Sequence, residues 1–315
     1  MIHRNAVFAL LAALMLGIAI PSAAAQGEPL QYNHSAGIVT MSTDDLEIKV
    51  VGVNESPHFH WWDPNNPDID YHMRFISLFE VNDTNADGVF TRGVDTVIGP
   101  RFMLPVADWD FSGFETDTDG ENVTAVHFNF TSTSGFDPRP SGMDNDWTHL
   151  PPMAEFDVYV QIRVHIYMDN PSEVKFDVII DGWNWSFNDS LLVMQFTLTE
   201  SNHGAGHTET APGQMHKTGT KFQFENGYME YEPTALAANN SLQVKASYGE
   251  GVGLEAGESV YLSFPYFGNE TLIYDPILGI NSASNTQLID TPTLILIGGA
   301  VAVIAVVAIA MKIRK

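Results

Sequence analysis

The chain has 315 residues, of which 44% are hydrophobic and 17% charged, and it contains no cysteine. This balance excludes a disordered polymer and a polytopic membrane protein, and the lack of cysteine excludes disulfide bonds. Acidic residues outnumber basic residues by 39 to 14. Because such a surface repels phosphate groups, we expect no nucleic-acid partner.

Both ends of the chain carry patterns for export and membrane anchoring. Residues 1–25 combine a basic start, an apolar run and an Ala-x-Ala ending, as a secretory signal peptide does. An uncleaved N-terminal anchor is the alternative. Residues 293–311 are apolar, uncharged and long enough to span a bilayer, and a basic tail follows at 312–315. The sequence therefore predicts a single-pass cell-membrane protein with an extracellular ectodomain at 26–280, a stalk at 281–292 and a cytoplasmic C-terminus.

The predicted ectodomain is strongly acidic and rich in glycosylation motifs. Four of the 14 basic residues lie at the chain ends, which leaves 10 against 39 acidic residues and a net charge of −29. Asn-x-Ser/Thr motifs accept N-linked glycans in exported proteins, and about three are expected by chance. The chain has them at Asn33, Asn54, Asn82, Asn122, Asn129, Asn184, Asn188, Asn239 and Asn269. Acidity, glycosylation motifs and the lack of cysteine together favour an archaeal cell envelope.

Alternation of apolar and polar residues predicts an all-β ectodomain. The clearest case is a strand at 156–168, a turn, and a second strand at 174–180, which together predict a hairpin. Further strands are expected at 38–41, 46–53, 73–81, 96–103, 126–130, 192–198, 222–224, 242–246 and 260–264. Because no linker divides the middle of the chain, the pattern favours one large antiparallel β-sandwich over a pair of them. Residues 135–153 and 201–219 are expected as long loops of the kind that often bind ligands.

A calcium-binding loop is predicted where the chain reads Asp-Thr-Asn-Ala-Asp-Gly-Val-Phe, from residue 83 to residue 90. Oxygen ligands at positions 1, 3 and 5, a glycine at position 6 and a carbonyl at position 7 can surround a calcium ion. The segment resembles the calcium loops of EF-hands and dockerins. It departs from them at position 12, which is a valine, so the closing ligand is expected from Asp95 or Glu80. The candidate calcium ligands are Asp83, Asn85, Asp87, Val89 and Asp95, and the alternative is an acidic turn.

A looser copy of this pattern starts at Glu115. Asp117 and Asp119 occupy positions 3 and 5, and a glycine follows. Glutamate is unusual at position 1, and the glycosylation motif at Asn122 lies inside the pattern. The segment is a second candidate calcium loop, and a solvated acidic turn is the alternative.

Histidines provide candidate ligands for a transition metal. His203 and His207 flank a pliant Gly-Ala-Gly segment, and His216 follows nine residues later. Imidazoles of this kind bind zinc or copper, although three histidines in a surface loop are also simply polar residues. His58 and His60 alternate beside two tryptophans and would lie on one strand face, where a packed aromatic cluster is the alternative.

Signatures of common enzymes are missing from the sequence. It contains no Gly-x-Ser-x-Gly, no His-Glu-x-x-His, no phosphate-binding glycine loop and no cysteine nucleophile. Acidic pairs such as Asp68 and Asp70 could in principle support glycosidic catalysis. A chain with 39 acidic residues contains such pairs without any catalytic purpose, so the sequence does not favour an enzyme.

The segment 174–192 places a Gly-Trp corner between two apolar strands. It resembles a segment of uncharacterised membrane-anchored archaeal surface proteins. The resemblance implies an extracellular location and β architecture, and it implies no activity. Together these features predict a membrane-anchored, glycosylated, calcium-stabilised surface protein that binds a glycan or protein ligand or mediates adhesion. A metal-dependent or carbohydrate-active surface enzyme is the alternative, and the oligomeric state is not indicated.

Overall fold

A computed structural model describes residues 30–35, 37–52, 56–132, 158–202, 215–250 and 258–281. The predicted signal peptide, most of the stalk, the predicted membrane-spanning segment and the basic tail lie outside these residues, as do Asn54, His203 and His207. Within the described part of the chain, no helix is both long enough and apolar enough to cross a bilayer.

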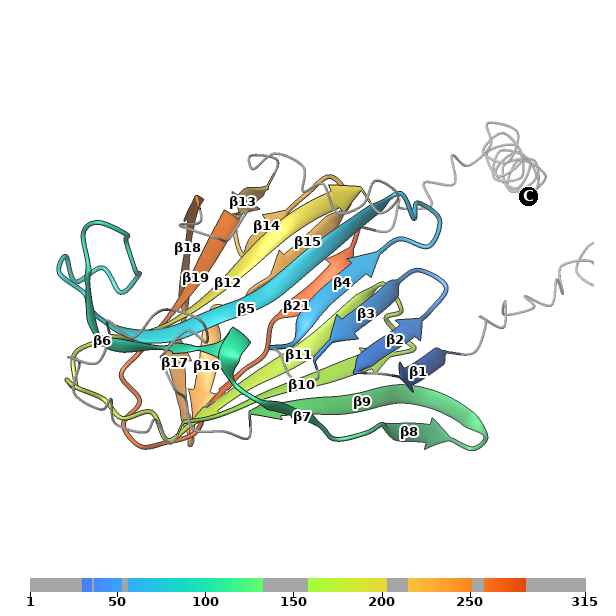
Figure 1. The fold of residues 1–315 in the computed structure, drawn as a ribbon, viewed down its shortest axis with the longest axis horizontal. Coiled ribbons are helices and arrows are strands. Elements are labelled where there is room, and N and C mark those ends of the chain that lie inside the picture. Colours follow the sequence, from blue (N-terminus) through green and yellow to red (C-terminus); the bar gives the residue numbers. More distant parts are fainter. Residues whose placement is uncertain are drawn as a thin grey trace, which may run out of the picture.

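The described residues form two antiparallel sheets (Figure 1). The first sheet has nine strands, in the spatial order β1 (Gln31–Ser35), β2 (Ile38–Ser42), β3 (Glu47–Val51), β4 (His58–Trp62), β5 (Ile69–Asn82), β12 (Leu191–Asn202), β19 (Glu258–Pro265) and β18 (Lys245–Glu250), with β6 (Thr96–Met103) paired to the second half of β5. Helical structure in these ranges is limited to one 3-10 turn at Leu104–Val106. For the described residues, the prediction of an all-β, antiparallel ectodomain is confirmed.

The second sheet has twelve strands. Its main path runs through β13 (His216–Thr218), β14 (Lys221–Gln223), β15 (Gly227–Glu230), β21 (Ile277–Ile280), β11 (Glu173–Asp181), β10 (Tyr159–Tyr167), β9 (Asn122–Ser132) and β7 (Trp109–Phe111). Beside this path, β8 (Glu115–Asp119) pairs with β9, β20 (Leu272–Tyr274) with β11, β16 (Thr234–Ala237) with β20, and β17 (Asn240–Gln243) with β16. The predicted hairpin is confirmed as β10 and β11, with Ile162 opposite Val178.

The inner faces of the two sheets share one apolar core. Phe59 of the first sheet lies 5.6 Å from Phe176 of the second, measured between ring centroids. The indole Nε1 of Trp61 donates a hydrogen bond to the carbonyl of Gly279, 3.1 Å away. Because removing apolar surface from water is the main stabilising term in folding, this shared core holds the two sheets together.

A β-bulge divides β5 into two halves. Phe196 pairs with Phe75 and Gln195 with Ser77, so Ile76 is an extra residue in the ladder. An extra residue moves the side chains that follow it to the opposite face of the sheet, relative to an uninterrupted alternation. Before the bulge, odd-numbered residues such as Met73 face the shared core. After the bulge, odd-numbered residues join a separate apolar cluster outside that core, formed by Phe79, Val81, Phe90, Leu191, Val193 and Tyr261.

Candidate metal centre

Three histidines converge on the outer face of the first sheet, on strands β4 and β5. The turn between these strands starts at Asp63, whose carboxylate accepts the N–H of Asn65 at 2.7 Å. The resulting register places His60 directly opposite His72, and His58 lies two residues from His60 on the same face. Each histidine offers one nitrogen, and these three atoms lie within 4.8 Å of one another. Among the described residues, no other group of three histidines or carboxylates comes this close.

A buried carboxylate supports two of the three imidazoles. Asp70 is 2% exposed, and its Oδ2 lies 3.5 Å from Nδ1 of His60 and 3.1 Å from Nε2 of His72. Ser201 of β12 lies opposite Asp70 and donates its hydroxyl hydrogen to Oδ1. The Ser201 hydroxyl oxygen also lies 2.7 Å from Nε2 of His72. Because Ser201 donates its hydrogen to Asp70, Nε2 of His72 is the donor in this second bond. These contacts orient both rings, as carboxylates do behind the histidine ligands of metal sites.

The surroundings favour the neutral form of His58 and His60. Burial, together with the neighbouring His60 and His72, lowers the pKa of His58 to about 3. Burial also lowers the pKa of His60, although its hydrogen bond to Asp70 opposes that shift. Burial alone would raise the pKa of Asp70, but hydrogen bonds from His60, His72 and Ser201 outweigh it and lower the pKa. A neutral imidazole has the lone pair that a metal ion needs, and an ionised carboxylate behind it strengthens the ligand.

The sequence pointed to two of these three histidines and missed the third. The spacing of His58 and His60 indicated one strand face, but His72 joins them only through the cross-strand register. The sequence nevertheless contains a signal for the hairpin that brings His72 to the other two. The run Asp-Pro-Asn-Asn-Pro-Asp at 63–68 is rich in turn formers and separates two segments that each contain alternating polar residues. Folding these segments into a hairpin places His60 and His72 side by side.

The predicted calcium loop lies between β5 and β6 and is closed by its own hydrogen bonds. Asp83 accepts the N–H groups of Asp87 and Gly88, at 3.2 and 2.7 Å. Asp95 accepts those of Thr84 and Thr91, at 2.9 and 2.6 Å. Two other predicted ligands also make hydrogen bonds within the loop. The side-chain amide of Asn85 donates to the carboxylate of Asp87, and that carboxylate accepts the N–H of Val89. Calcium binding at this loop stays a prediction.

The candidate closing ligand Glu80 points elsewhere. Its carboxylate is 2% exposed and accepts the N–H groups of Ser186 and Phe187, at 2.9 and 3.0 Å, and the hydroxyl of Ser190. Glu80 therefore holds the turn after β11. Asp95 is the acid that contacts the predicted loop.

The second candidate calcium segment is an extended strand. Glu115, Asp117 and Asp119 alternate along β8, which forms a tight hairpin with β9. Asp117 lies 3.1 Å from Nε2 of His127 on the neighbouring strand. The three carboxylates thus share one side of a strand, and the structure does not wrap them into a loop.

The remaining predicted site residues are distributed over the surface. His216 is exposed at the start of β13, and its two predicted partners lie outside the described residues. Asn129, on β9, is half-buried. The other predicted glycosylation sites within the described ranges are exposed, namely Asn33, Asn82, Asn122, Asn184, Asn188, Asn239 and Asn269.

Comparisons with known proteins identify no family. No protein-family model and no curated protein matches the chain. Among solved structures, it is similar to the heparan sulfate lyase HepC from Pedobacter heparinus, with 9% identity over 80% of this chain and 36% of that chain and a TM-score of 0.37. It is also similar to HI1317, with 9% identity over 80% of this chain and 98% of that chain and a TM-score of 0.26. The chain spans about a third of the length of the lyase. Similarity at these scores establishes neither the fold nor the activity of this chain.

Proposed function

We propose that this chain is a membrane-anchored cell-surface glycoprotein of β-sandwich architecture that binds a divalent transition-metal ion, zinc in the first instance, at His58, His60 and His72. The metal-binding part of the proposal rests on one observation, the convergence of three imidazole nitrogens within 4.8 Å of one another. Two nitrogens bound to one tetrahedral zinc ion are about 3.3 Å apart. Small side-chain rotations would therefore bring the three nitrogens into coordination.

Nitrogen donors decide which metals this site favours. Imidazole suits zinc, copper and nickel, whereas calcium and magnesium prefer oxygen. If Asp70 keeps its contacts with Nδ1 of His60 and Nε2 of His72, the nitrogens that remain to bind the metal are Nε2 of His60 and Nδ1 of His72.

Calcium is proposed separately, as a stabilising ion at the loop that starts with Asp83. Membrane anchoring and glycosylation are proposed from the terminal patterns and the Asn-x-Ser/Thr motifs.

Zinc titration of the full-length protein in detergent tests the metal site. After treatment with a chelator, competition with a zinc-binding dye should give one zinc ion per chain. His60→Ala and His72→Ala should each abolish this binding, and His72→Gln, which keeps a hydrogen-bonding side chain, should do the same. His34→Ala is the matched control because His34 is exposed on β1, at the edge of the same sheet.

His216→Ala separates this site from the predicted histidine loop and should leave zinc binding intact. Melting curves establish that each variant is folded. The proposal fails if folded His60→Ala and His72→Ala proteins bind zinc as the unaltered chain does, or if calcium and magnesium displace zinc at equal concentration.

The number of ligands supports a second candidate, a metal-dependent hydrolase. Catalytic zinc is typically held by three protein ligands, which leaves a fourth position for water. An activated ester tests this alternative. Zinc-dependent hydrolysis that disappears in His60→Ala would favour the enzyme, and stoichiometric zinc without turnover would favour a binding role.

A further inference from the structure

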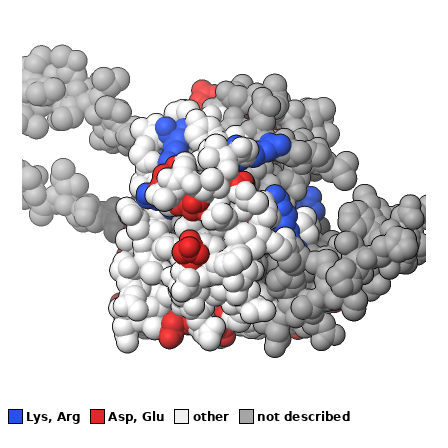
Figure 2. Space-filling model, turned by 90° about the vertical axis from the view of Figure 1, so that its left-hand side faces the viewer, with Lys and Arg blue, Asp and Glu red and all other residues white. Residues whose placement is uncertain are grey.

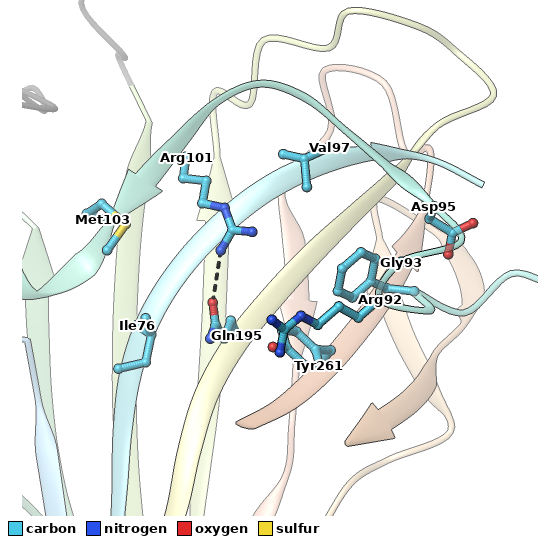
Figure 3. Close-up of a pocket in the computed structure, with 10 residues that line it drawn as sticks. Ile76, Arg92, Gly93, Asp95, Val97, Arg101, Met103, Gln195 and Tyr261 are labelled. Carbon is cyan, nitrogen blue, oxygen red and sulfur yellow. Dashed lines mark hydrogen bonds between the residues drawn. The ribbon is translucent and has the colours of Figure 1, made fainter. Parts of the chain in front are cut away.

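A cavity of about 380 Å³ lies at the other end of the same sheet face, beyond the bulge in β5 (Figure 3). Its floor is formed by Gln195 of β12 and Tyr261 of β19, which are 4% and 6% exposed. Its walls come from β5, from β6 and from the turn that follows Phe90. Small-molecule sites usually enclose about 300–1,000 Å³, so this cavity suits a ligand of monosaccharide size.

Two arginines line the cavity. Figure 3 shows the side chains of Arg92 and Arg101 both directed toward Gln195, from the turn before β6 and from β6 itself. The described ranges contain four arginines, so half of them line this one cavity. Figure 2 looks at the end of the molecule that carries this turn, and Lys and Arg patches there are as prominent as Asp and Glu patches. In a chain with 39 acidic and 14 basic residues, such a concentration of arginine favours an anionic ligand.

A buried polar network positions one of the arginines. The amide oxygen of Gln195 accepts hydrogen bonds from the Ser77 hydroxyl at 3.1 Å and from Nη1 of Arg101 at 3.3 Å. The amide nitrogen of Gln195 donates to the Ser259 hydroxyl at 3.1 Å. The guanidinium carbon of Arg101 also lies 4.2 Å from the centre of the Phe79 ring. Because a guanidinium carries five donors in a planar fork, Arg101 can hold an oxyanion while it keeps the bond to Gln195.

The acid in the cavity wall is directed elsewhere. Asp95 accepts backbone N–H groups from Thr84 and Thr91, and Figure 3 shows its carboxylate pointing away from Arg101 and Gln195. Apolar side chains complete the lining, namely Ile76, Val97 and Met103. The cavity therefore combines a cationic side with an apolar side.

We propose that this cavity binds a small organic acid, with its oxyanion group held by Arg92 and Arg101 and its uncharged body against Val97 and Met103. The oxyanion is a carboxylate, a sulfate ester or a phosphate ester, since the guanidinium fork matches all three. This site is separate from the proposed metal centre, and neither proposal depends on the other.

Sugar acids of one ring size test the proposal on the full-length protein in detergent. Glucuronate, glucose 6-sulfate and glucose 6-phosphate are titrated by calorimetry at low ionic strength, with glucose as the uncharged control. At least one of the three acids should bind and glucose should not. Which acid binds identifies the oxyanion. Arg92→Gln and Arg101→Gln should each weaken the binding about tenfold or more, because each removes charged hydrogen bonds to the ligand.

Arg163→Gln is the matched control because it removes an exposed arginine from β10 on the other sheet. Binding should be unchanged in this variant, and melting curves establish that all three variants are folded. The proposal is overturned if none of the acids binds, if glucose binds equally well, or if binding survives in the folded double variant of Arg92 and Arg101. An equal loss of binding in Arg163→Gln also overturns it, because the effect would then be one of overall charge.

Discussion

The imidazole of His58 is held neutral by its surroundings, and this has a consequence for stability. Its pKa is lowered from 6.5 to about 3, first by burial and then by the neighbouring basic side chains His60, His72 and Arg74. An unfolded histidine takes up a proton near pH 6.5, whereas folded His58 does so only near pH 3. Between these values the unfolded state binds more protons, so the stability of the metal-free protein should fall as the pH decreases.

The prediction is checked by urea unfolding between pH 7 and pH 5, where most carboxylates remain ionised. The urea midpoint should fall with decreasing pH in the unaltered chain and should fall less steeply in His58→Gln. Parallel curves for the two proteins would contradict the prediction, because they would mean that His58 takes up its proton at the same pH in the folded and unfolded states.

Asp70 should control metal affinity without touching the metal. It contacts His60 and His72 and accepts the Ser201 hydroxyl, so Asp70→Asn removes the charge that supports both rings. Loss of such a supporting carboxylate typically weakens metal binding about 10–100-fold. Dye competition should show this loss with one zinc ion still bound per chain. Ser201→Ala is the comparison, and an Asp70→Asn protein with unchanged zinc affinity would contradict the prediction.

At the scale of the strands, two sheets approach closely where a glycine allows it. A Cβ atom added to Gly227 of β15 would lie 2.5 Å from the ring of Tyr71, whose side chain is buried in the core. Gly227→Ala should therefore lower the free energy of unfolding by about 1–3 kcal/mol, as overpacking of a core usually does. Gly249→Ala on β18 should change it by less than about 0.5 kcal/mol, because nothing lies within 4 Å of its added Cβ. Equal effects in urea unfolding would contradict this account.

The loop between β5 and β6 carries the calcium prediction. If the loop binds calcium only when folded, a hundredfold excess over Kd should stabilise the protein by about 2.7 kcal/mol. Asp83→Ala should abolish this gain, whereas Asp169→Ala, at an exposed turn, should keep it. Melting curves in calcium, magnesium and matched sodium chloride separate specific binding from screening of the acidic surface. A response to calcium no larger than the response to matched ionic strength would leave the segment as an acidic turn.

Local patterns in the sequence predicted the long strands and missed most of the short ones. The strands β10, β11 and β12 have at least nine residues each, so their alternation stands out. Strands of three or four residues, such as β13, β16 and β20, contain too few alternations and form because neighbouring strands pair with them. The same limit applies to the sites. Two ligands on one strand were visible, whereas His72 and the arginine cavity depend on cross-strand pairing and on the bulge at Ile76.

At the scale of the whole molecule, the terminal patterns predict how the chain is placed in the membrane. Protease added to intact cells should release an ectodomain of roughly residues 26–290, because a single helix with a basic cytoplasmic tail would anchor it. Immunoblotting detects the released fragment, and a cytoplasmic marker protein that stays uncut is the control. Recovery of the full-length chain in the soluble cytoplasmic fraction would refute both terminal assignments.

The extra residue in β5 also affects how this protein can diverge. Upstream of Ile76, His72 of β5 lies on the outer face with the histidine centre, and downstream the odd-numbered residues Ser77 and Phe79 contact Gln195 and Arg101 of the arginine cavity. Loss of that single residue would put the two halves of the strand in one alternating frame, and one half would then turn its side chains to the opposite face. A point substitution would change one side chain of one site and leave the other side chains of that site in place. A one-residue deletion at position 76 would remove a whole site in one step. The presence or absence of this residue should therefore distinguish descendants of this protein that keep both sites from those that keep only one.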